Sequence, residues 1–244
     1  MDTASLENAT VVVIGGGSGI GFAVAAGAAA DGASVVIGST DERKLATAAE
    51  RLPGSTRALQ IDVTSEPSVA RFFAQIGSFD HLVFTSGNWD VAPIGSPAEA
   101  DISHLNAAMA VRFFGAVRAV KYGCRSIAAT GSITLTSGAL AYRPHKGMWG
   151  WSPVAGALST LAAGLAVELA PVRVNVVSPG VIVSADEEGT ASNGMHRSVG
   201  HILSRLPSHR SGLPAEAAQA YLYSMKGSYT TGQEIRVDGG YSVV

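Results

Sequence analysis

The stretch Thr10–Gly21, TVVVIGGGSGIG, decides the fold expected for this chain of 244 residues. Thr10–Ile14 is a continuous and mostly apolar run, which predicts a strand buried on both faces, as in a parallel sheet. Glycines follow at once, and Gly19–Ala30 then has the composition of a helix. Because such a turn lets backbone N–H groups approach a pyrophosphate at the positive end of a helix, it predicts a dinucleotide-binding site.

Short β-rich runs alternate with alanine-rich helical segments along the rest of the chain. The expected strands are Thr10–Ile14, Ser34–Ile37, Ala58–Ile61, Asp80–Thr85, Ser132–Leu135, Arg173–Val177 and Glu234–Val237. The expected helices are Gly19–Ala30, Asp41–Arg51, Ser65–Ile76, Asp101–Lys121, Ser152–Leu169 and Pro214–Met225. Repeated strand–helix units imply right-handed crossovers and a doubly wound sheet.

We therefore expect one α/β Rossmann domain over residues 1–244, with a mostly parallel seven-stranded sheet covered by helices on both faces. Residues 1–130 form the nucleotide-binding half, and residues 131–244 form the half that holds the substrate and nicotinamide. The long irregular region at about 184–212 is expected to be a substrate lid.

Composition excludes several classes of protein. With 17 basic and 19 acidic residues, the chain has no cationic field for nucleic acid. The single cysteine, Cys124, excludes internal disulfides, and the histidines are too scattered for a metal site. No apolar run reaches the length of a membrane span, and Met1–Ala9 is unlike a secretory signal, so we expect a cytoplasmic protein without membrane partners.

The spacing of Gly15, Gly19, Ile20 and Gly21 resembles the short-chain dehydrogenase/reductase family rather than the older GxGxxG dehydrogenases. The resemblance extends along nearly the whole chain. Its further matches are Asp62-Val63, Gly131-Ser132-Ile133, the segment Arg173–Gly180, Thr231-Gly232-Gln233 and the segment Val237–Gly240. Thr85-Ser86-Gly87 stands where the family has Asn-Ala-Gly, so its first two positions differ.

The resemblance implies a nicotinamide cofactor and a set of residues that hold it. The predicted cofactor-binding residues are Gly15, Gly17, Ser18, Gly19, Ile20, Gly21, Ser39, Thr40, Arg43, Asp62, Val63, Ser86, Gly87, Pro179, Gly180, Val181 and Ser184. Within this set, Asp62-Val63 corresponds to the adenine contact, while Val181 and Ser184 stand where contacts to the carboxamide are expected.

The choice of cofactor is expected to depend on the end of the second strand, where an acidic residue would bind both ribose hydroxyls and repel a 2′-phosphate. This chain has Gly38-Ser39-Thr40, and the first carboxylate, Asp41, is the expected cap of the next helix. Arg43 and Lys44 lie within one turn, although both fit an ordinary solvated helix face as well. NADP(H) is therefore favoured over NAD(H).

The resemblance fails at the catalytic residues. The family uses a tyrosine acid/base, a lysine four residues later, a serine and an asparagine. Alignment from both sides places these positions at Trp151, Ala155, Gly138 and Arg112, respectively. Tyr142 and Tyr122 have no lysine four residues on. The resemblance therefore implies an atypical active site without the usual proton relay.

Four residues remain as candidate catalytic groups: Arg112, Ser137, His145 and Trp151. Arg112 is a fixed cation suited to a carboxylate or an enolate-like oxygen, and Ser137 can donate one hydrogen bond. His145 can shuttle a proton, whereas Trp151 offers an N–H group but no transferable proton. The alternatives are a structural ion pair for Arg112, a solvated turn for His145, and core or interface packing for Trp151.

An iminium ion is already electrophilic, so hydride alone completes its reduction. Some imine reductases of the family, a few of them coupled to a cyclisation, likewise look altered in the Tyr/Lys pair. We therefore expect an NADP(H)-dependent reductase of a polarised C=N, C=C or C=O bond in a small molecule, and a carboxylate-bearing or zwitterionic imine suits Arg112 best. The alternatives are a nucleotide-binding pseudoenzyme, a non-redox isomerase or cyclase, and a carbonyl reductase with a displaced acid.

The two helices Asp101–Lys121 and Ser152–Leu169 carry small and apolar residues on more than one face. A helix that is apolar on several sides needs a second surface to cover it. Family members pair these helices between subunits, and the C-terminal Tyr241–Val244 corresponds to another interface in many of them. We expect a homodimer or a homotetramer.

Overall fold

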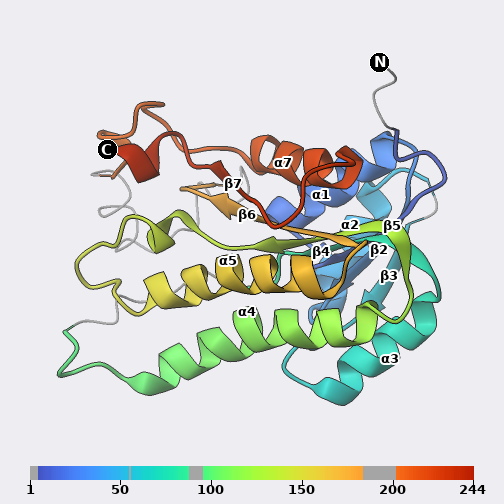
Figure 1. The fold of residues 1–244 in the computed structure, drawn as a ribbon, viewed down its shortest axis with the longest axis horizontal. Helices are drawn as coiled ribbons and strands as arrows, with labels where there is room; N and C mark the ends of the chain where they lie inside the picture. Colours follow the sequence, from blue (N-terminus) through green and yellow to red (C-terminus); the bar gives the residue numbers. More distant parts are fainter. Residues whose placement is uncertain (1–4, 55, 88–95, 184–201) are drawn as a thin grey trace.

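A seven-stranded sheet forms the centre of the structure, a computed structural model that describes residues 5–54, 56–87, 96–183 and 202–244 (Figure 1). The strand order is β3-β2-β1-β4-β5-β6-β7, and every neighbouring pair is parallel. The strands are β1 Thr10–Ile14, β2 Ser34–Ser39, β3 Arg57–Gln60, β4 Phe79–Phe84, β5 Ile127–Thr136, β6 Arg173–Pro179 and β7 Glu234–Val237. The strand order reverses between β1 and β4, so the expected doubly wound Rossmann fold is confirmed.

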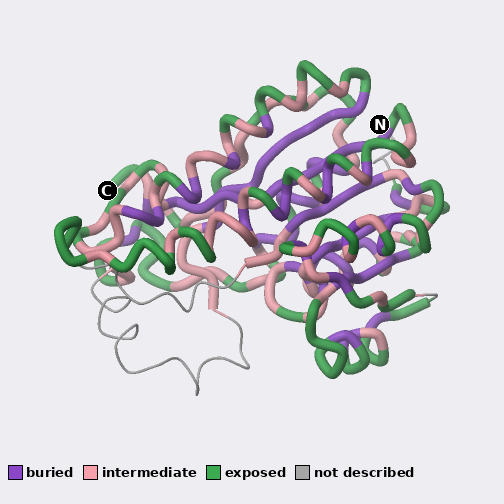
Figure 2. Tube along the Cα trace, turned by 90° about the horizontal axis from the view of Figure 1, so that it is seen from below, coloured by how far each residue is buried: buried purple, intermediate pink, exposed green. Residues whose placement is uncertain are grey.

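Helices cover both faces of the sheet (Figure 1). Their bounds are α1 Gly19–Ala30, α2 Glu42–Arg51, α3 Glu66–Ile76, α4 Ile102–Gly123, α5 Trp151–Glu168 and α7 Pro214–Lys226. One apolar cluster joins α3, α4 and α5 to the sheet, and a second one joins α1, α2 and α7 to it. The buried residues follow the strands between these two helix layers (Figure 2). In both layers the helices follow strands in the chain, so they begin on the side of the sheet where the strands have their carboxyl ends. Ligands bind at this edge in such folds.

Local signals in the sequence fix most of the helix starts. The Asp41 side chain accepts hydrogen bonds from the backbone N–H groups of Arg43 and Lys44, both at 3.0 Å, and so caps α2. Ser65 caps α3 in the same way, through the N–H of Ser68. Strand β5 begins at Ile127 rather than at the expected Ser132. The sequence does not indicate this earlier start, because the first residues of the strand are partly exposed and lack a buried apolar pattern.

Most of the expected lid, at about 184–212, lies outside the described residues. Its described end packs against the chain: Leu206 is buried, and Gly212 forms a β-bridge with Ile182. Within the described ranges, no helix has both the length and the apolar character needed to cross a bilayer. In the same part of the chain, His, Cys, Asp and Glu side chains do not gather in groups that could hold a metal ion.

His81 in β4 should make the stability of the fold depend on pH. It is 8% exposed, and its Nδ1 lies 2.9 Å from the hydroxyl oxygen of Ser132. Burial, opposed by Asp80, lowers the pKa of His81 from 6.5 to about 4. The unfolded chain therefore takes up this proton first, and the free energy of unfolding falls by up to about 3 kcal/mol as the pH drops from 6.5 to 4.

Urea unfolding at several pH values between 4 and 7 measures this loss. A His81→Gln variant is the control, because it has no titrating ring and should lose less stability over the same interval. Equal pH dependence in the two proteins would contradict a role for His81.

Candidate active site

The glycine turn between β1 and α1 is closed so tightly that side chains do not fit at Gly15, Gly16 or Gly21. A Cβ atom on Gly21 would lie 2.2 Å from the carbonyl oxygen of Gly15 and 2.5 Å from Oγ1 of Thr85. Gly15 itself has a positive φ of +96°. Thr85 stands at the first position of the segment that corresponds to Asn-Ala-Gly, just after β4. Its hydroxyl donates to the carbonyl of Ile14 at 3.1 Å and so supports the turn.

The N-terminus of α1 opens from this turn with its backbone donors available. Ser18 is the N-cap residue, is exposed, and makes no hydrogen bond to the helix through its side chain. The first N–H groups of a helix have no partner inside the helix, so they can bind the pyrophosphate of a dinucleotide. The turn and the open helix end fit a nicotinamide dinucleotide, with Gly15–Gly21 as its cradle.

The adenosine end of the predicted site lies where the glycine turn meets β2 and α2. A Cβ atom on Gly17 would lie 3.4 Å from Cβ of Lys44 and 3.6 Å from the hydroxyl of Ser39. Thr40, Arg43 and Lys44 are all exposed. Arg43 is the predicted contact and Lys44 its neighbour in the same helical turn, and Cβ of Lys44 is the atom nearest to the Cβ position on Gly17.

The predicted adenine contact follows β3. The Asp62 carboxylate accepts hydrogen bonds from the N–H and the hydroxyl of Thr64, at 2.8 and 2.7 Å, which fixes the local turn. The Val63 side chain is buried, and its carbonyl accepts a hydrogen bond from Arg118. Asp62 and Val63 are therefore fixed in position after the carboxyl end of β3, on the same edge of the sheet as the glycine turn after β1.

The predicted nicotinamide end lies in segments that follow β4 and β6. Gly180 follows β6, and its N–H donates to the carbonyl of Val237 at 3.0 Å, while a Cβ atom on it would lie 2.7 Å from Cα of Asp238. The C-terminal motif thus fixes the segment Pro179–Val181. Ser184, the last predicted contact, lies outside the described residues.

Arg112 is a buried cation near the carboxyl end of β4. It projects from α4, is 5% exposed, and packs on Gly87 so closely that a Cβ atom there would lie 2.7 Å from Cζ of Arg112. Burial lowers the pKa of Arg112 to about 10, and Tyr221 opposes this shift. The guanidinium therefore remains charged at neutral pH, just after the carboxyl end of β4.

Tyr221 is a polar group that the sequence analysis did not predict. Its side chain is fully buried, and its hydroxyl lies 2.8 Å from Oγ1 of Thr136, which in turn donates to the carbonyl of Phe84 at 2.6 Å. Burial raises the pKa of Tyr221 well above its usual range. Because Tyr221 comes from α7 and Arg112 from α4, polar groups from both helix layers reach the ends of β4 and β5.

Trp151 and Ala155 occupy the first two turns of α5, and both are buried. Trp151 is 1% exposed and forms an apolar cluster with Val154 and partly buried neighbours. Those neighbours are Ala100, Leu105, Ala108, Met109, Leu140, Met148 and Trp149. The indole is therefore part of a packed apolar wall beside α4.

The Ser137 hydroxyl is engaged within the fold. Its side chain is 1% exposed, and its hydroxyl donates to the carbonyl of Ala155 at 2.9 Å, with the Ser159 hydroxyl 3.2 Å away. A serine has one proton to donate, and here it joins the segment after β5 to α5. Donation from Ser137 to a substrate would require this hydrogen bond to break, and it stays a prediction.

His145 lies in the loop before α5 and packs edge-on against Tyr241, with ring centroids 5.4 Å apart. The hydroxyl of Tyr241 donates to the carbonyl of Arg143 at 3.3 Å, so the C-terminal segment holds this loop. His145 thus contacts the C-terminal segment, whereas Arg112 belongs to α4 and Trp151 to α5.

The site is that of a nicotinamide-dependent oxidoreductase. The sequence matches the family described as enoyl-(acyl carrier protein) reductase over residues 15–242. The chain belongs to the short-chain dehydrogenase/reductase family.

Relatives match over their whole length. The short-chain dehydrogenase/reductase fsr5 of Gibberella fujikuroi is 31% identical over 97% of this chain and 96% of its own. The MalC reductase/Diels-Alderase of Malbranchea aurantiaca has a structure with a TM-score of 0.89 and 26% identity, and 100% of each chain is covered. A small-chain dehydrogenase in complex with NADPH has a TM-score of 0.79 and 31% identity, over 98% of this chain and 100% of that one.

Proposed function

We propose that this protein binds NADP(H) and reduces a polarised C=N bond in a small organic zwitterion or carboxylate, with a polarised C=C or C=O bond as the wider class. The observation that carries this proposal is the buried cation Arg112, packed on Gly87 at the carboxyl end of β4. Bound NADPH would supply a hydride. The glycine turn, the N-terminus of α1 and the segment Pro179–Val181 would hold the cofactor.

The residues at the aligned catalytic positions favour a substrate that needs no proton from a tyrosine. Trp151 has an N–H group but no proton that it can transfer at neutral pH, and Ala155 carries no charge. Arg112 provides a positive charge that can bind the carboxylate of the substrate. Such a cation would repel a simple iminium ion, so a substrate that also carries a negative charge fits better.

A panel of cyclic imines with and without a carboxylate tests this function, with NADPH oxidation followed at 340 nm. Conjugated enones form the second arm of the panel. We expect turnover of the carboxylate-bearing imines, and a failure to oxidise NADPH with every member would refute a reductase.

Lys44 should contribute most of the preference for NADP(H). It is the basic residue whose Cβ atom lies nearest to the Cβ position on Gly17, and Ser39 at the end of β2 lies near the same position, where a 2′-phosphate would bind. Lys44→Ala is expected to weaken NADPH binding about tenfold and to leave NADH binding nearly unchanged, because one charge-assisted contact is lost. Titration of cofactor fluorescence measures both constants. Arg43→Ala is the matched control, and a larger loss in that variant would contradict the assignment to Lys44.

The MalC reductase/Diels-Alderase supports a second candidate, because its name joins a reduction to a cycloaddition. In that case this chain would form product without consuming NADPH, as an isomerase or cyclase. A pseudoenzyme is the third candidate, and it would bind NADPH tightly without turning over any substrate. Product analysis with and without NADPH separates all three.

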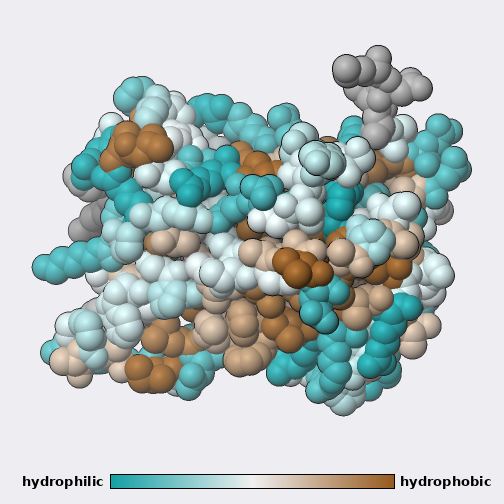
Figure 3. All heavy atoms as spheres, in the orientation of Figure 1, coloured by the Kyte–Doolittle hydropathy of each residue, from teal (hydrophilic) through white to brown (hydrophobic). Residues whose placement is uncertain are grey.

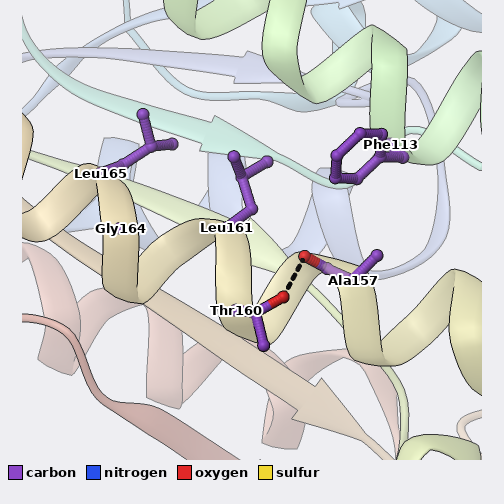
Figure 4. Close-up of a pocket in the computed structure, with 6 residues that line it drawn as sticks. All are labelled: Phe113, Ala157, Thr160, Leu161, Gly164 and Leu165. Carbon is purple, nitrogen blue, oxygen red and sulfur yellow. Dashed lines mark hydrogen bonds between the residues drawn. The ribbon is translucent and has the colours of Figure 1, made fainter.

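We propose a homodimer or homotetramer that pairs α4 and α5 between subunits. A shallow groove on these helices is lined by apolar side chains (Figure 4). Its lining residues are Phe113, Ala157, Thr160, Leu161, Gly164 and Leu165. Hydrophobic residues also gather over part of this face (Figure 3). On the same two helices, Phe114 of α4 is 49% exposed and Val167 of α5 is 82% exposed. The cytoplasmic location stays a prediction.

Light scattering after size exclusion should give the mass of a dimer or a tetramer. A Cβ atom on Gly164 meets nothing within 4 Å, so Gly164→Arg should leave the fold of each subunit intact. The variant is expected to give a lower mass at equal concentration, with unchanged circular dichroism. A monomeric wild type would contradict the proposal.

A further inference from the structure

The loop between β5 and α5 is fastened to the edge strand β7 by one tyrosine. The hydroxyl of Tyr142 donates to the carboxylate of Glu234, the first residue of β7. The guanidinium of Arg236 lies over the Tyr142 ring, with Cζ 3.6 Å from the centroid. We call these three residues the Tyr142 latch.

The start of the same loop is also joined to α5. Ser137, which directly follows β5, is the residue that makes this contact: its hydroxyl donates to the carbonyl of Ala155 at 2.9 Å, and the Ser159 hydroxyl lies 3.2 Å away. At Tyr142, burial and the hydrogen bond to Glu234 raise the pKa of the phenol, and Arg236 opposes this shift. Polar contacts thus hold the loop at two places, to α5 through Ser137 and to β7 through Tyr142.

The fastened loop carries residues on the substrate side of the site. It begins at Gly138, the aligned serine position, passes His145 and Trp149, and ends at Trp151, where α5 starts. Trp149 belongs to the same apolar cluster as Trp151. A shift of the loop would therefore move this apolar wall.

We propose that Tyr142 is a positioning residue, which sets the substrate-side loop by fastening it to β7. This inference rests on the proposed reductase function for its kinetic part only. A single hydrogen bond between exposed groups contributes little. Here, however, a carboxylate and a cation both contact Tyr142, and the Tyr241 contact to Arg143 fixes a second point of the same loop.

The chain offers a matched control at Tyr122, at the end of α4. Its hydroxyl donates to Glu66 at 2.9 Å, and Arg125 lies over its ring, with Cζ 5.1 Å from the centroid. The chemistry is the same as in the Tyr142 latch, but Tyr122 joins α4 to α3 and not a loop of the site. Comparing variants of the two tyrosines therefore distinguishes the general effect of losing a hydroxyl from an effect on the loop between β5 and α5.

The experiment compares Tyr142→Phe with Tyr122→Phe by two measurements. The first is acrylamide quenching of tryptophan fluorescence, which requires no substrate. We expect Tyr142→Phe to raise the quenching constant at least twofold, because Trp149 becomes more accessible, and Tyr122→Phe to leave it unchanged. The second is the steady-state rate with a substrate from the imine panel. We expect KM to rise about tenfold in Tyr142→Phe, with kcat within twofold of wild type.

Equal quenching and equal KM in the two variants would overturn the proposal. If no substrate is turned over, the quenching comparison alone decides, so failure of the reductase function and failure of the latch are distinguishable. Glu234→Gln provides a second variant should Tyr142→Phe fold poorly. It keeps the shape of the side chain while removing its charge, and we expect changes in the same direction but smaller. Unchanged quenching in Glu234→Gln would also count against the latch.

Discussion

Gly21→Ala is expected to abolish nicotinamide-nucleotide binding. The added Cβ atom would lie 2.2 Å from the Gly15 carbonyl oxygen and 2.5 Å from Oγ1 of Thr85. One of these neighbours is backbone, so the turn between β1 and α1 must open to accept the methyl group, and the cradle for the pyrophosphate is lost. We expect the Kd for NADPH to rise by about 100-fold or more, as for a loss of about 3 kcal/mol.

Fluorescence titration with NADPH measures this constant, and circular dichroism checks the fold. Gly17→Ala is the control, because its nearest contact is 3.4 Å and involves the side chain of Lys44. That variant should lose at most a few-fold in affinity. Wild-type affinity in Gly21→Ala would show that the cofactor does not bind at this turn.

Arg112→Gln is expected to lower kcat/KM by about 100-fold or more for a carboxylate-bearing imine. The side chain is 5% exposed, and a charge in such a site acts far more strongly on a bound anion than it would in water. Cofactor affinity should change much less, since the predicted contacts to the adenosine and the pyrophosphate lie at the β1–α1 turn, at the end of β2, on α2 and after β3. The effect should therefore appear in the rate and not in the Kd for NADPH.

Two comparisons make this prediction specific to Arg112. Arg125→Gln removes an exposed arginine just after α4, one that lies over the ring of Tyr122, and should leave the rate nearly unchanged. An imine without a carboxylate should be less sensitive to Arg112→Gln than a carboxylate-bearing one. Equal losses with both imines would mean that Arg112 supports the fold and does not bind the substrate.

The sequence predicted the fold well because its signals are local. The apolar run Thr10–Ile14, its glycine turn and the caps Asp41 and Ser65 each act within a few residues. The start of β5 was missed because Ile127 and the residues after it are not buried in an alternating pattern. Pairing with β4, and not local hydrophobicity, extends this strand.

The site was predicted only where a motif marks it. The positions of Gly15–Gly21 and Arg112 followed from spacing, but the partners of Tyr221 and Tyr142 are 85 and 92 residues away in the sequence. No local pattern indicates such contacts, so both tyrosines were missed as parts of the site. Lys44 and Arg43 are adjacent on α2, and the sequence alone does not show which of them lies nearer to the glycine turn.

We propose that the chain binds a nicotinamide nucleotide and reduces its substrate without a tyrosine–lysine relay. NADPH deuterated at the transferable position is supplied together with the carboxylate-bearing imines, and the products are analysed by mass spectrometry. We expect a product that is heavier by about one mass unit, formed in step with cofactor consumption. A product without deuterium, or tight NADPH binding with no product at all, would contradict this proposal.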